Sequence, residues 1–224
     1  MWIWINFHFD NLTPYAYASS ILPLSISWRG GRGVRSVEAI MNEKTLAFHY
    51  VCTPKEAREL VRQHDRFWVS NCGCRESRGK CDRSRIDVCL MFRDDIAGSG
   101  GSGKREISPA ELEEIFQEAK QKHLVTRPFR NEENMLETDG ICFCCDDCCE
   151  YFLNPSVIKC DNGAFIEMTD RDKCNNCGIC VDVCYFGARK MDNRELVLER
   201  DNCYGCGLCV EVCPEDCLQM VPRE

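Results

Sequence analysis

The stretch that decides the fold runs from Arg171 to Met220 and reads RDKCNNCGICVDVCYFGARKMDNRELVLERDNCYGCGLCVEVCPEDCLQM. It contains the cysteine spacing C-x-x-C-x-x-C-x-x-x-C twice, and a proline follows the second copy. Residues 171–191 and 200–220 share ten identities over 21 positions, including all four cysteines. This internal repeat predicts one supersecondary unit that is used twice.

The spacing of the cysteines in each copy suits a cubane iron–sulfur cluster. Thiolates at positions i, i+3 and i+6 of a tight loop can reach three irons, and the fourth cysteine begins a helix that leads away from them. Each fourth cysteine is therefore predicted to bind the cluster of the other motif. Gly178 and Gly207 allow positive-φ backbone close to the inorganic sulfurs. Zinc, the competing interpretation, favours closed four-ligand sites built from two C-x-x-C pairs.

With these two complete motifs, the segment from about Phe165 to Val221 resembles the bacterial-type dicluster ferredoxins. The resemblance implies an α+β fold, with a small dicluster domain of two pseudo-repeats and two [4Fe–4S] clusters. The ligands that it implies for one cluster are Cys174, Cys177, Cys180 and Cys213, and for the other Cys203, Cys206, Cys209 and Cys184. Tyr185 departs from the family, which usually has proline at this position.

Nine further cysteines form two dense groups before this segment. They are Cys72, Cys74, Cys81 and Cys89 in the first group, and Cys142, Cys144, Cys145, Cys148 and Cys149 in the second. We expect at least one additional metal site among them, foremost a third iron–sulfur cluster, with zinc or redox-active dithiols as alternatives. The first group is the better self-contained four-ligand site. Structural roles are expected for Cys52, Cys160 and Cys217.

The whole region 52–224 resembles extended, cysteine-rich ferredoxin-like proteins of anaerobes. The residues that carry this resemblance are the C-x-C-R segment 72–75, the V-C-L segment 88–90 and the C-x-C-C segment 142–145. Asp147 stands where that group leads us to expect another cysteine. The resemblance implies a cysteine-rich domain of mixed helices and strands before the dicluster domain.

Two upstream helix starts share one capping pattern. The segments 53–56 (TPKE) and 108–111 (SPAE) each combine a hydroxyl N-cap, a proline at the first helical position and a glutamate three residues after the cap. An apolar stripe follows each start, made of Ala57, Leu60 and Val61 in the first helix and of Leu112, Ile115, Phe116 and Ala119 in the second. A strand is predicted over 67–69, and a polar stretch is expected between the second helix and Cys142.

The glycine-rich segment 98–104 fits most of a phosphate-binding G-x-x-x-x-G-K loop. Arg105 stands where Ser or Thr would bind magnesium, and no hydrophobic strand precedes the segment. A Gly/Ser linker is therefore predicted.

Composition narrows the class of protein. Among 224 residues, 44% are hydrophobic and 20 are cysteine, and the net charge is −8. Clustered cysteines favour thiolate metal sites in a reducing cytoplasm over disulfides. The negative net charge argues against nucleic-acid binding. The sequence contains no apolar run of about 20 residues, so no membrane span is predicted. The four histidines, which lie in no motif and are expected at the surface or in caps, are His8, His49, His64 and His123.

We therefore expect three parts: an N-terminal extension over 1–50, a cysteine-rich helix/strand domain over 51–159, and a dicluster ferredoxin domain over 160–224. A strand is considered for 1–9, and a flexible break at 30–33. The predicted function is single-electron relay through two [4Fe–4S] clusters to a partner redox protein. The alternative is an oxidoreductase subunit whose upstream cysteines form a catalytic metal or thiol site fed by the ferredoxin segment. No residue is assigned a catalytic role.

Overall fold

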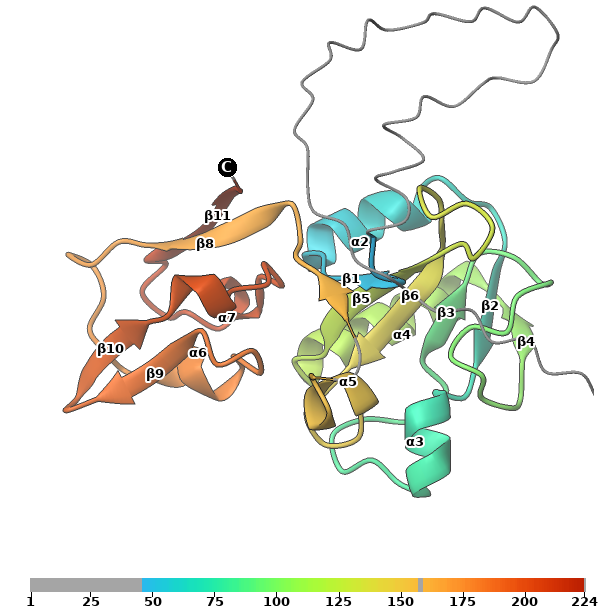
Figure 1. Cartoon of the computed structure of the whole chain (residues 1–224), viewed down its shortest axis with the longest axis horizontal. Coiled ribbons are helices and arrows are strands. Elements are labelled where there is room, and N and C mark those ends of the chain that lie inside the picture. The colour runs from blue at the N-terminus through green and yellow to red at the C-terminus, as the bar shows by residue number, and fades with distance from the viewer. Residues whose placement is uncertain (1–45, 157–158, 224) are drawn as a thin grey trace, which may run out of the picture. The chain divides into compact units, whose positions relative to one another are not determined.

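A computed structural model describes residues 46–156 and 159–223 (Figure 1). The strand considered for 1–9, the break at 30–33 and His8 lie outside the described residues. The described chain mixes helices and strands, as the α+β prediction requires. None of the helices in this part of the chain is long and apolar enough to cross a membrane.

A seven-stranded sheet forms the core of the region before the dicluster segment. Its strands lie in the order β4-β2-β3-β6-β5-β1-β7, and the β1–β7 pair is parallel while the other pairs are antiparallel. The strands are β1 (His49–Tyr50), β2 (Phe67–Ser70), β3 (Cys89–Met91), β4 (Arg105–Ile107), β5 (Val125–Arg130), β6 (Thr138–Cys144) and β7 (Cys160–Asp161). The sheet thus includes β1 and β7, which lie just outside the expected limits, 51–159, of the cysteine-rich domain.

Two longer helices, α2 (Pro54–Val61) and α4 (Pro109–Gln121), begin at the predicted capping boxes. The Glu56 N–H donates to Thr53 Oγ1 at 3.2 Å, and the Thr53 N–H donates to Glu56 Oε2 at 2.8 Å. Ser108 makes the same reciprocal pair with Glu111. The predicted stripe of α4 is fully buried, whereas in α2 Ala57 is buried and the other two stripe residues are partly buried. Both helices contribute to one hydrophobic cluster.

The region between α4 and the second cysteine group is more regular than expected. Instead of a polar stretch, the chain forms β5 and β6, which pair from Val125 opposite Cys144 to Arg130 opposite Thr138. The predicted strand over 67–69 is confirmed as β2. Two short helices, α3 (Gly73–Arg78) and α5 (Glu150–Leu153), each follow a cysteine. The upstream cysteines therefore lie on sheet strands or in the loops around them, except Cys74, which lies in α3.

The glycine-rich segment 98–104 is a packed loop, which corrects the expectation of a linker. The Asn71 N–H donates to the Ser102 carbonyl at 2.9 Å. Gly101 permits this approach, because a Cβ at this residue would lie 1.9 Å from the Asn71 carbonyl oxygen. Lys104 Nζ donates to a backbone carbonyl at 2.8 Å. The loop therefore packs on the residues that lead into α3.

The C-terminal module contains two small sheets and two short helices (Figure 1). Strand β8 (Phe165–Thr169) pairs with β11 (Leu218–Pro222), and β9 (Arg189–Asp192) pairs with β10 (Glu195–Leu198). The 3₁₀-helix η1 (Arg200–Asn202) precedes the second cysteine loop. The helices α6 (Ile179–Asp182) and α7 (Leu208–Glu211) contain the third cysteine of each motif and end before the fourth, so the expectation that the fourth cysteine begins a helix is wrong. Gly178 and Gly207 precede these helices with φ of 82° and 78°, in the left-handed region that glycine permits.

Candidate iron–sulfur and thiolate sites

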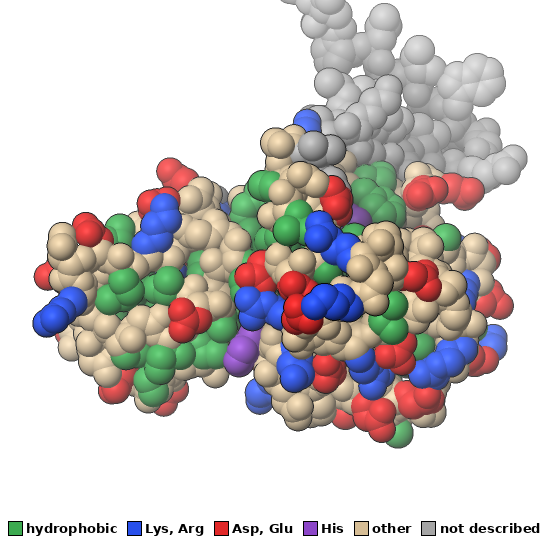
Figure 2. Space-filling view, turned by 90° about the horizontal axis from the view of Figure 1, so that it is seen from below, with side chains coloured by type: hydrophobic (Ala, Val, Ile, Leu, Met, Phe, Trp, Pro, Cys, Tyr) green, Lys and Arg blue, Asp and Glu red, His purple; other side chains and the backbone are tan. Residues whose placement is uncertain are grey.

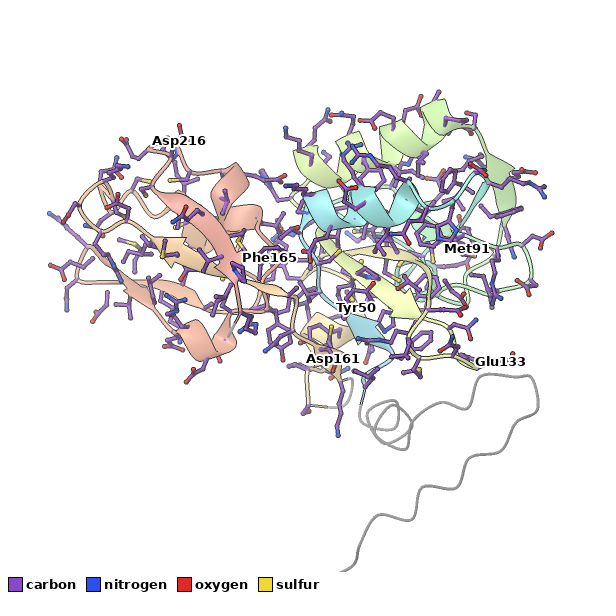
Figure 3. The ribbon with its side chains drawn as sticks, turned by 90° about the horizontal axis from the view of Figure 1, so that it is seen from above. Tyr50, Met91, Glu133, Asp161, Phe165 and Asp216 are labelled. Carbon is purple, nitrogen blue, oxygen red and sulfur yellow. The ribbon has the colours of Figure 1, made fainter. Side chains whose placement is uncertain are left out.

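The eight cysteines of the two motifs surround two cavities in the module. One cavity is lined by Cys174, Cys177, Cys180 and Cys213. The other is lined by Cys184, Cys203, Cys206 and Cys209. We call these the first and second cavity. Each meets three cysteines of one motif and the fourth cysteine of the other motif, and Figure 3 shows sulfur atoms inside the module.

The surroundings of both cavities fit a [4Fe–4S] cluster. Four cysteine thiolates are the usual ligand set of such a cluster. Leu196 and Leu218 give the first cavity apolar walls, and Phe186 and Met220 do the same for the second. The grouping of the cysteines is the one that crossed ligation requires. It supports that assignment, which remains a prediction.

Arg189 lines both cavities and is 2% exposed. Its Nη1 donates to Cys180 Sγ at 3.4 Å, and its Nη2 forms an ion pair with the buried Glu167. Burial by itself would lower the pKa of Arg189, but the neighbouring Cys209 and Glu167 raise it above the ordinary value. A permanent positive charge therefore lies between the two cavities. Sequence reasoning missed it, although the repeat aligns Arg189 with the buried Leu218.

Burial controls the protonation of the thiols around the cavities. It raises the pKa of Cys209 to about 12 and also raises the pKa of Cys184. The pKa of Cys180 rises for the same reason, although Arg189 partly opposes the effect. These thiols are protonated at neutral pH unless a metal binds, so loading them with iron must release protons.

The three cysteines that were expected to be structural have different surroundings. Cys52 is 2% exposed, and burial raises its pKa to about 12, which suits an inert core thiol. Cys217 is buried, but its Sγ lies 3.4 Å from Cys213 Sγ, and it lines the first cavity. Cys160 is half-buried, and burial raises its pKa. Arg127 lowers the pKa of Cys160, but by less than burial raises it.

The upstream cysteines are not grouped as their spacing suggested. Cys81 Sγ lies 3.6 Å from Cys145 Sγ, and Cys145 Sγ lies 3.5 Å from Cys148 Sγ. We call these three residues the thiol trio; their sulfur atoms all lie within 4.8 Å of one another. Cys81 thus joins the second sequence group, because β3 pairs with β6 and brings the two segments together. The four-ligand site expected from the first group alone stays a prediction, and Cys81, one of its members, lies with two cysteines of the second group.

Two buried arginines face thiols instead of carboxylates. Arg75, which is 1% exposed, has Nη2 3.9 Å from Cys145 Sγ. Arg127, which is 2% exposed, has Nη1 3.6 Å from Cys144 Sγ and 3.3 Å from Cys149 Sγ. Neither arginine forms an ion pair with a carboxylate of the described residues. A buried guanidinium needs a compensating negative charge, which thiolates can supply.

His49 is not at the surface as expected. It lies half-buried in β1, with Nε2 3.8 Å from Cys142 Sγ. Burial lowers the pKa of His49 to about 4, with a smaller contribution from Arg127, so the imidazole is neutral at neutral pH. His64 stacks on an aromatic ring, and His123 follows α4 with a φ of 51°. Sequence reasoning had no signal for His49, because its neighbour Cys142 is far away along the chain.

Aromatic rings connect the second cavity with the thiols beside Arg127. Phe186 and Tyr204 line this cavity, and their rings stack with centroids 4.5 Å apart. The Tyr151 ring centroid lies 6.2 Å from that of Tyr204. The Arg127 guanidinium carbon lies 4.2 Å from the Tyr151 ring centroid. Packed side chains therefore run from the second cavity to Cys144 and the other thiols at Arg127.

Tyr185 also packs on upstream residues. Its ring centroid lies 5.8 Å from that of Phe152, and the Arg83 guanidinium carbon lies 5.2 Å from the Tyr185 ring centroid. Arg83 in turn forms an ion pair with Asp146, which lies between Cys145 and Cys148 in the sequence. The aromatic ring that replaces the usual proline thus has contacts that a proline ring is too small to make.

Comparison with known proteins agrees with the geometry of the module. A family model described as the 4Fe-4S dicluster domain matches residues 157–217, which include all eight cysteines around the two cavities. No curated protein matches the chain. The C-terminal part of this chain is therefore similar to a ferredoxin-type module, and this match supports 4Fe–4S cluster binding and an electron-transfer role.

Proposed function

We propose that this chain is an electron carrier, or the electron-transfer subunit of a redox enzyme, that relays single electrons through two [4Fe–4S] clusters to a partner protein. The observation that supports it best is the pair of cavities, each with three cysteines of one motif and one of the other. In this proposal Cys174, Cys177, Cys180 and Cys213 hold one cluster, and Cys184, Cys203, Cys206 and Cys209 hold the other.

A bound [4Fe–4S] cluster supplies one-electron chemistry at a potential that the protein sets through hydrogen bonds, charge and solvent exposure. Here Arg189 contributes both a hydrogen bond to Cys180 Sγ and a buried positive charge. The apolar walls formed by Leu196 and Leu218 limit the access of water to the first cavity. The hydrogen bond and charge of Arg189 favour the reduced state, whereas the exclusion of water by the apolar walls opposes it.

The surroundings of the two cavities indicate which of them lies nearer to a docking surface for a partner protein. The second cavity contacts the upstream region through Phe186 and Tyr204, whereas Cys177 of the first cavity is exposed. Ile179 and Met191, which are 44% and 40% exposed, offer apolar contact area in the module. Figure 2 shows acidic, basic and hydrophobic side chains interspersed on the side of the module that it presents, and the region 161–224 has 13 acidic and 7 basic residues. We therefore place the docking of a redox partner with a basic surface at the first cavity.

The proposal is tested with anaerobically purified full-length protein and two cysteine variants. The protein should be brown and should bleach with dithionite. Cys184→Ala should damage the cluster of the second cavity, and Cys213→Ala the cluster of the first, with two distinct electron paramagnetic resonance spectra. Cys52→Ala, which removes a thiol outside both cavities, should leave the spectra unchanged. Colourless protein that contains only zinc would contradict the proposal.

A second candidate function is that of an oxidoreductase subunit with an upstream redox site. The observation that favours it is the pair of buried arginines, Arg75 and Arg127, that face thiols. A reductive titration of the full chain separates the two candidates, because two [4Fe–4S] clusters accept about two electrons. Uptake of more than two electrons per chain supports an upstream redox site, and uptake of two argues against it.

A further inference from the structure

The thiol trio is built from two parts of the chain that the fold brings together. Cys145 and Cys148 form a C-x-x-C pair in the turn after β6, and Cys81 comes from the loop after α3. The Asp82 N–H donates to Asp147 Oδ2 at 2.9 Å, which holds the loop of Cys81 against that turn. A C-x-x-C pair joined by a distant cysteine is a common arrangement for a thiolate-bound metal ion.

The distances between the sulfur atoms in the trio fit one ion. With metal–sulfur bonds of about 2.3 Å in a tetrahedron, two thiolates on the same ion lie about 3.8 Å apart. The sulfur atoms of Cys81 and Cys145 lie 3.6 Å apart, and those of Cys145 and Cys148 lie 3.5 Å apart. All three sulfur atoms lie within 4.8 Å of one another, which agrees with this value. In a cubane each cysteine binds a different iron, which places the sulfur atoms farther apart.

The dicluster module provides an internal comparison. Its eight cysteines line the first and second cavity, and no three of them have sulfur atoms that all lie within 4.8 Å of one another. Among the residues that the structure describes, the thiol trio is the one group of three or more candidate ligands whose ligand atoms all lie within 4.8 Å of one another. The same chain thus contains wide cysteine sites suited to clusters and one compact site suited to a single ion.

Charge also favours a bound cation at the trio over three neutral thiols. The Arg75 guanidinium, which is 1% exposed, is held by the carbonyls of Arg85 at 2.7 Å and Phe143 at 3.0 Å. Three thiolates and one divalent cation carry a net charge of −1, which the charge of Arg75 balances. Three neutral thiols, by contrast, would leave Arg75 buried without a compensating charge.

From these distances and charges we propose that Cys81, Cys145 and Cys148 bind one thiophilic divalent cation of the zinc type, with Arg75 as its buried counter-charge. No fourth Cys, His or carboxylate of the described residues joins the trio within the same distance. Asp147 accepts the hydrogen bond from Asp82 and thereby positions Cys81. A water molecule or an external ligand then completes the tetrahedron, as in zinc sites with three protein ligands.

The test uses the full chain, purified anaerobically with its iron sites loaded, and measures zinc, iron and acid-labile sulfide together. Wild-type protein should contain about one zinc ion per chain in addition to iron. Cys81→Ala should lower the zinc content at least tenfold without changing iron or sulfide. Cys52→Ala, a thiol outside the trio, should keep the zinc. Because Cys81 is only partly buried in a loop, its replacement should leave the fold intact, and retained iron shows that the dicluster module of each variant is folded.

X-ray absorption at the zinc edge of the wild-type protein gives an independent readout, which does not depend on a variant that folds. The spectrum should show three sulfur ligands at about 2.3 Å and one lighter atom. Zinc-free wild-type protein, unchanged zinc in Cys81→Ala, or four sulfur ligands would each overturn the proposal. Loss of iron and sulfide from Cys81→Ala would show a cluster at the trio instead. Because the iron of the module is counted separately, failure of this proposal leaves the electron-transfer proposal intact.

Discussion

Arg189 is a residue whose charge should be measurable as a shift in reduction potential. It lies in contact with Cys180 and lines both cavities. Reduction adds negative charge to a cluster, so a neighbouring cation stabilises the reduced state. We expect Arg189→Met to lower the reduction potential on the order of 100 mV, since charges at this range interact by a few kcal/mol at an effective dielectric constant near 20, and about 59 mV corresponds to about 1.4 kcal/mol for one electron. A potentiometric titration followed by electron paramagnetic resonance measures the shift.

A matched variant separates charge from packing at this position. Arg189→Lys keeps the positive charge next to Glu167, and its potential should stay closer to that of the wild type. If Arg189→Met and Arg189→Lys shift the potential equally, or if the Met variant shifts it upward, the electrostatic role assigned to Arg189 is wrong.

Cys52 should be chemically inert in the folded protein over most of the accessible pH range. Burial raises its pKa from 9.0 to about 12. The folded state keeps the proton of the Cys52 thiol more tightly than the unfolded state. The contribution of this thiol to the free energy of unfolding is therefore complete below pH 9 and is lost as the pH rises towards 12. Iodoacetamide at pH 8 should leave Cys52 unmodified until the chain is unfolded, as peptide mass spectrometry can show. Rapid alkylation in the native protein would be inconsistent with this burial.

Among the structural elements, the second cysteine loop depends on close backbone packing at Gly205. Gly205 and Gly187 both have positive φ, of 82° and 69°. A Cβ on Gly205 would lie 2.1 Å from the Phe165 carbonyl oxygen, whereas a Cβ on Gly187 would have no atom within 4 Å. Gly205→Ala should therefore lower the iron and sulfide content, and Gly187→Ala, with backbone strain but no clash, should retain both. Equal iron content in the two variants would contradict this reading of the loop.

The capping box of α2 makes a second prediction at this scale. Thr53→Ala removes the side-chain oxygen that accepts the Glu56 N–H, and we expect a loss of about 1 kcal/mol in unfolding free energy. Ser156→Ala, at an exposed residue outside any helix start, should change stability by less than about 0.5 kcal/mol. Denaturant unfolding of the cluster-loaded protein compares the two variants. A Thr53 variant as stable as the Ser156 variant would show that the cap contributes little.

The elements that could be predicted from the sequence are those with local causes. The helix starts at Thr53 and Ser108 depend on residues three positions apart, and the spacing of the motif cysteines is local in the same way. The thiol trio depends on the pairing of β3 with β6, which places Cys81 next to residues more than sixty positions away. No spacing rule within either cysteine group contains that information.

The buried arginines were missed for a related reason. An arginine is normally read as a surface residue, and its burial depends on partners that the fold supplies. Two signals were present: Arg75 directly follows Cys74 in the C-x-C-R segment, and Arg189 aligns with Leu218 in the second repeat. Tyr185 was noticed as a departure, but its packing on Phe152 needed the structure.

At the scale of the whole molecule, net charge should govern association with a redox partner. The chain carries −8, and the region 161–224 contains 13 acidic and 7 basic residues. Attraction to a basic partner is screened within about 8 Å at physiological ionic strength. The second-order rate of electron transfer to a positively charged acceptor protein should fall as salt rises, while the rate to a neutral small-molecule acceptor should change little. A rate that rises with salt would contradict docking through acidic residues.

Crossed ligation by the two motifs is the central claim, and anomalous diffraction at the iron edge, from crystals of anaerobically purified protein, tests it most directly. We predict two separate groups of iron atoms in the module. One should be bonded at about 2.3 Å to the sulfur atoms of Cys174, Cys177, Cys180 and Cys213, with the distance borrowed from zinc–thiolate bonds. The other should be bonded to Cys203, Cys206, Cys209 and Cys184. Cys184 Sγ bonded to the same cluster as Cys174 would contradict the account, as would an absence of iron from either cavity.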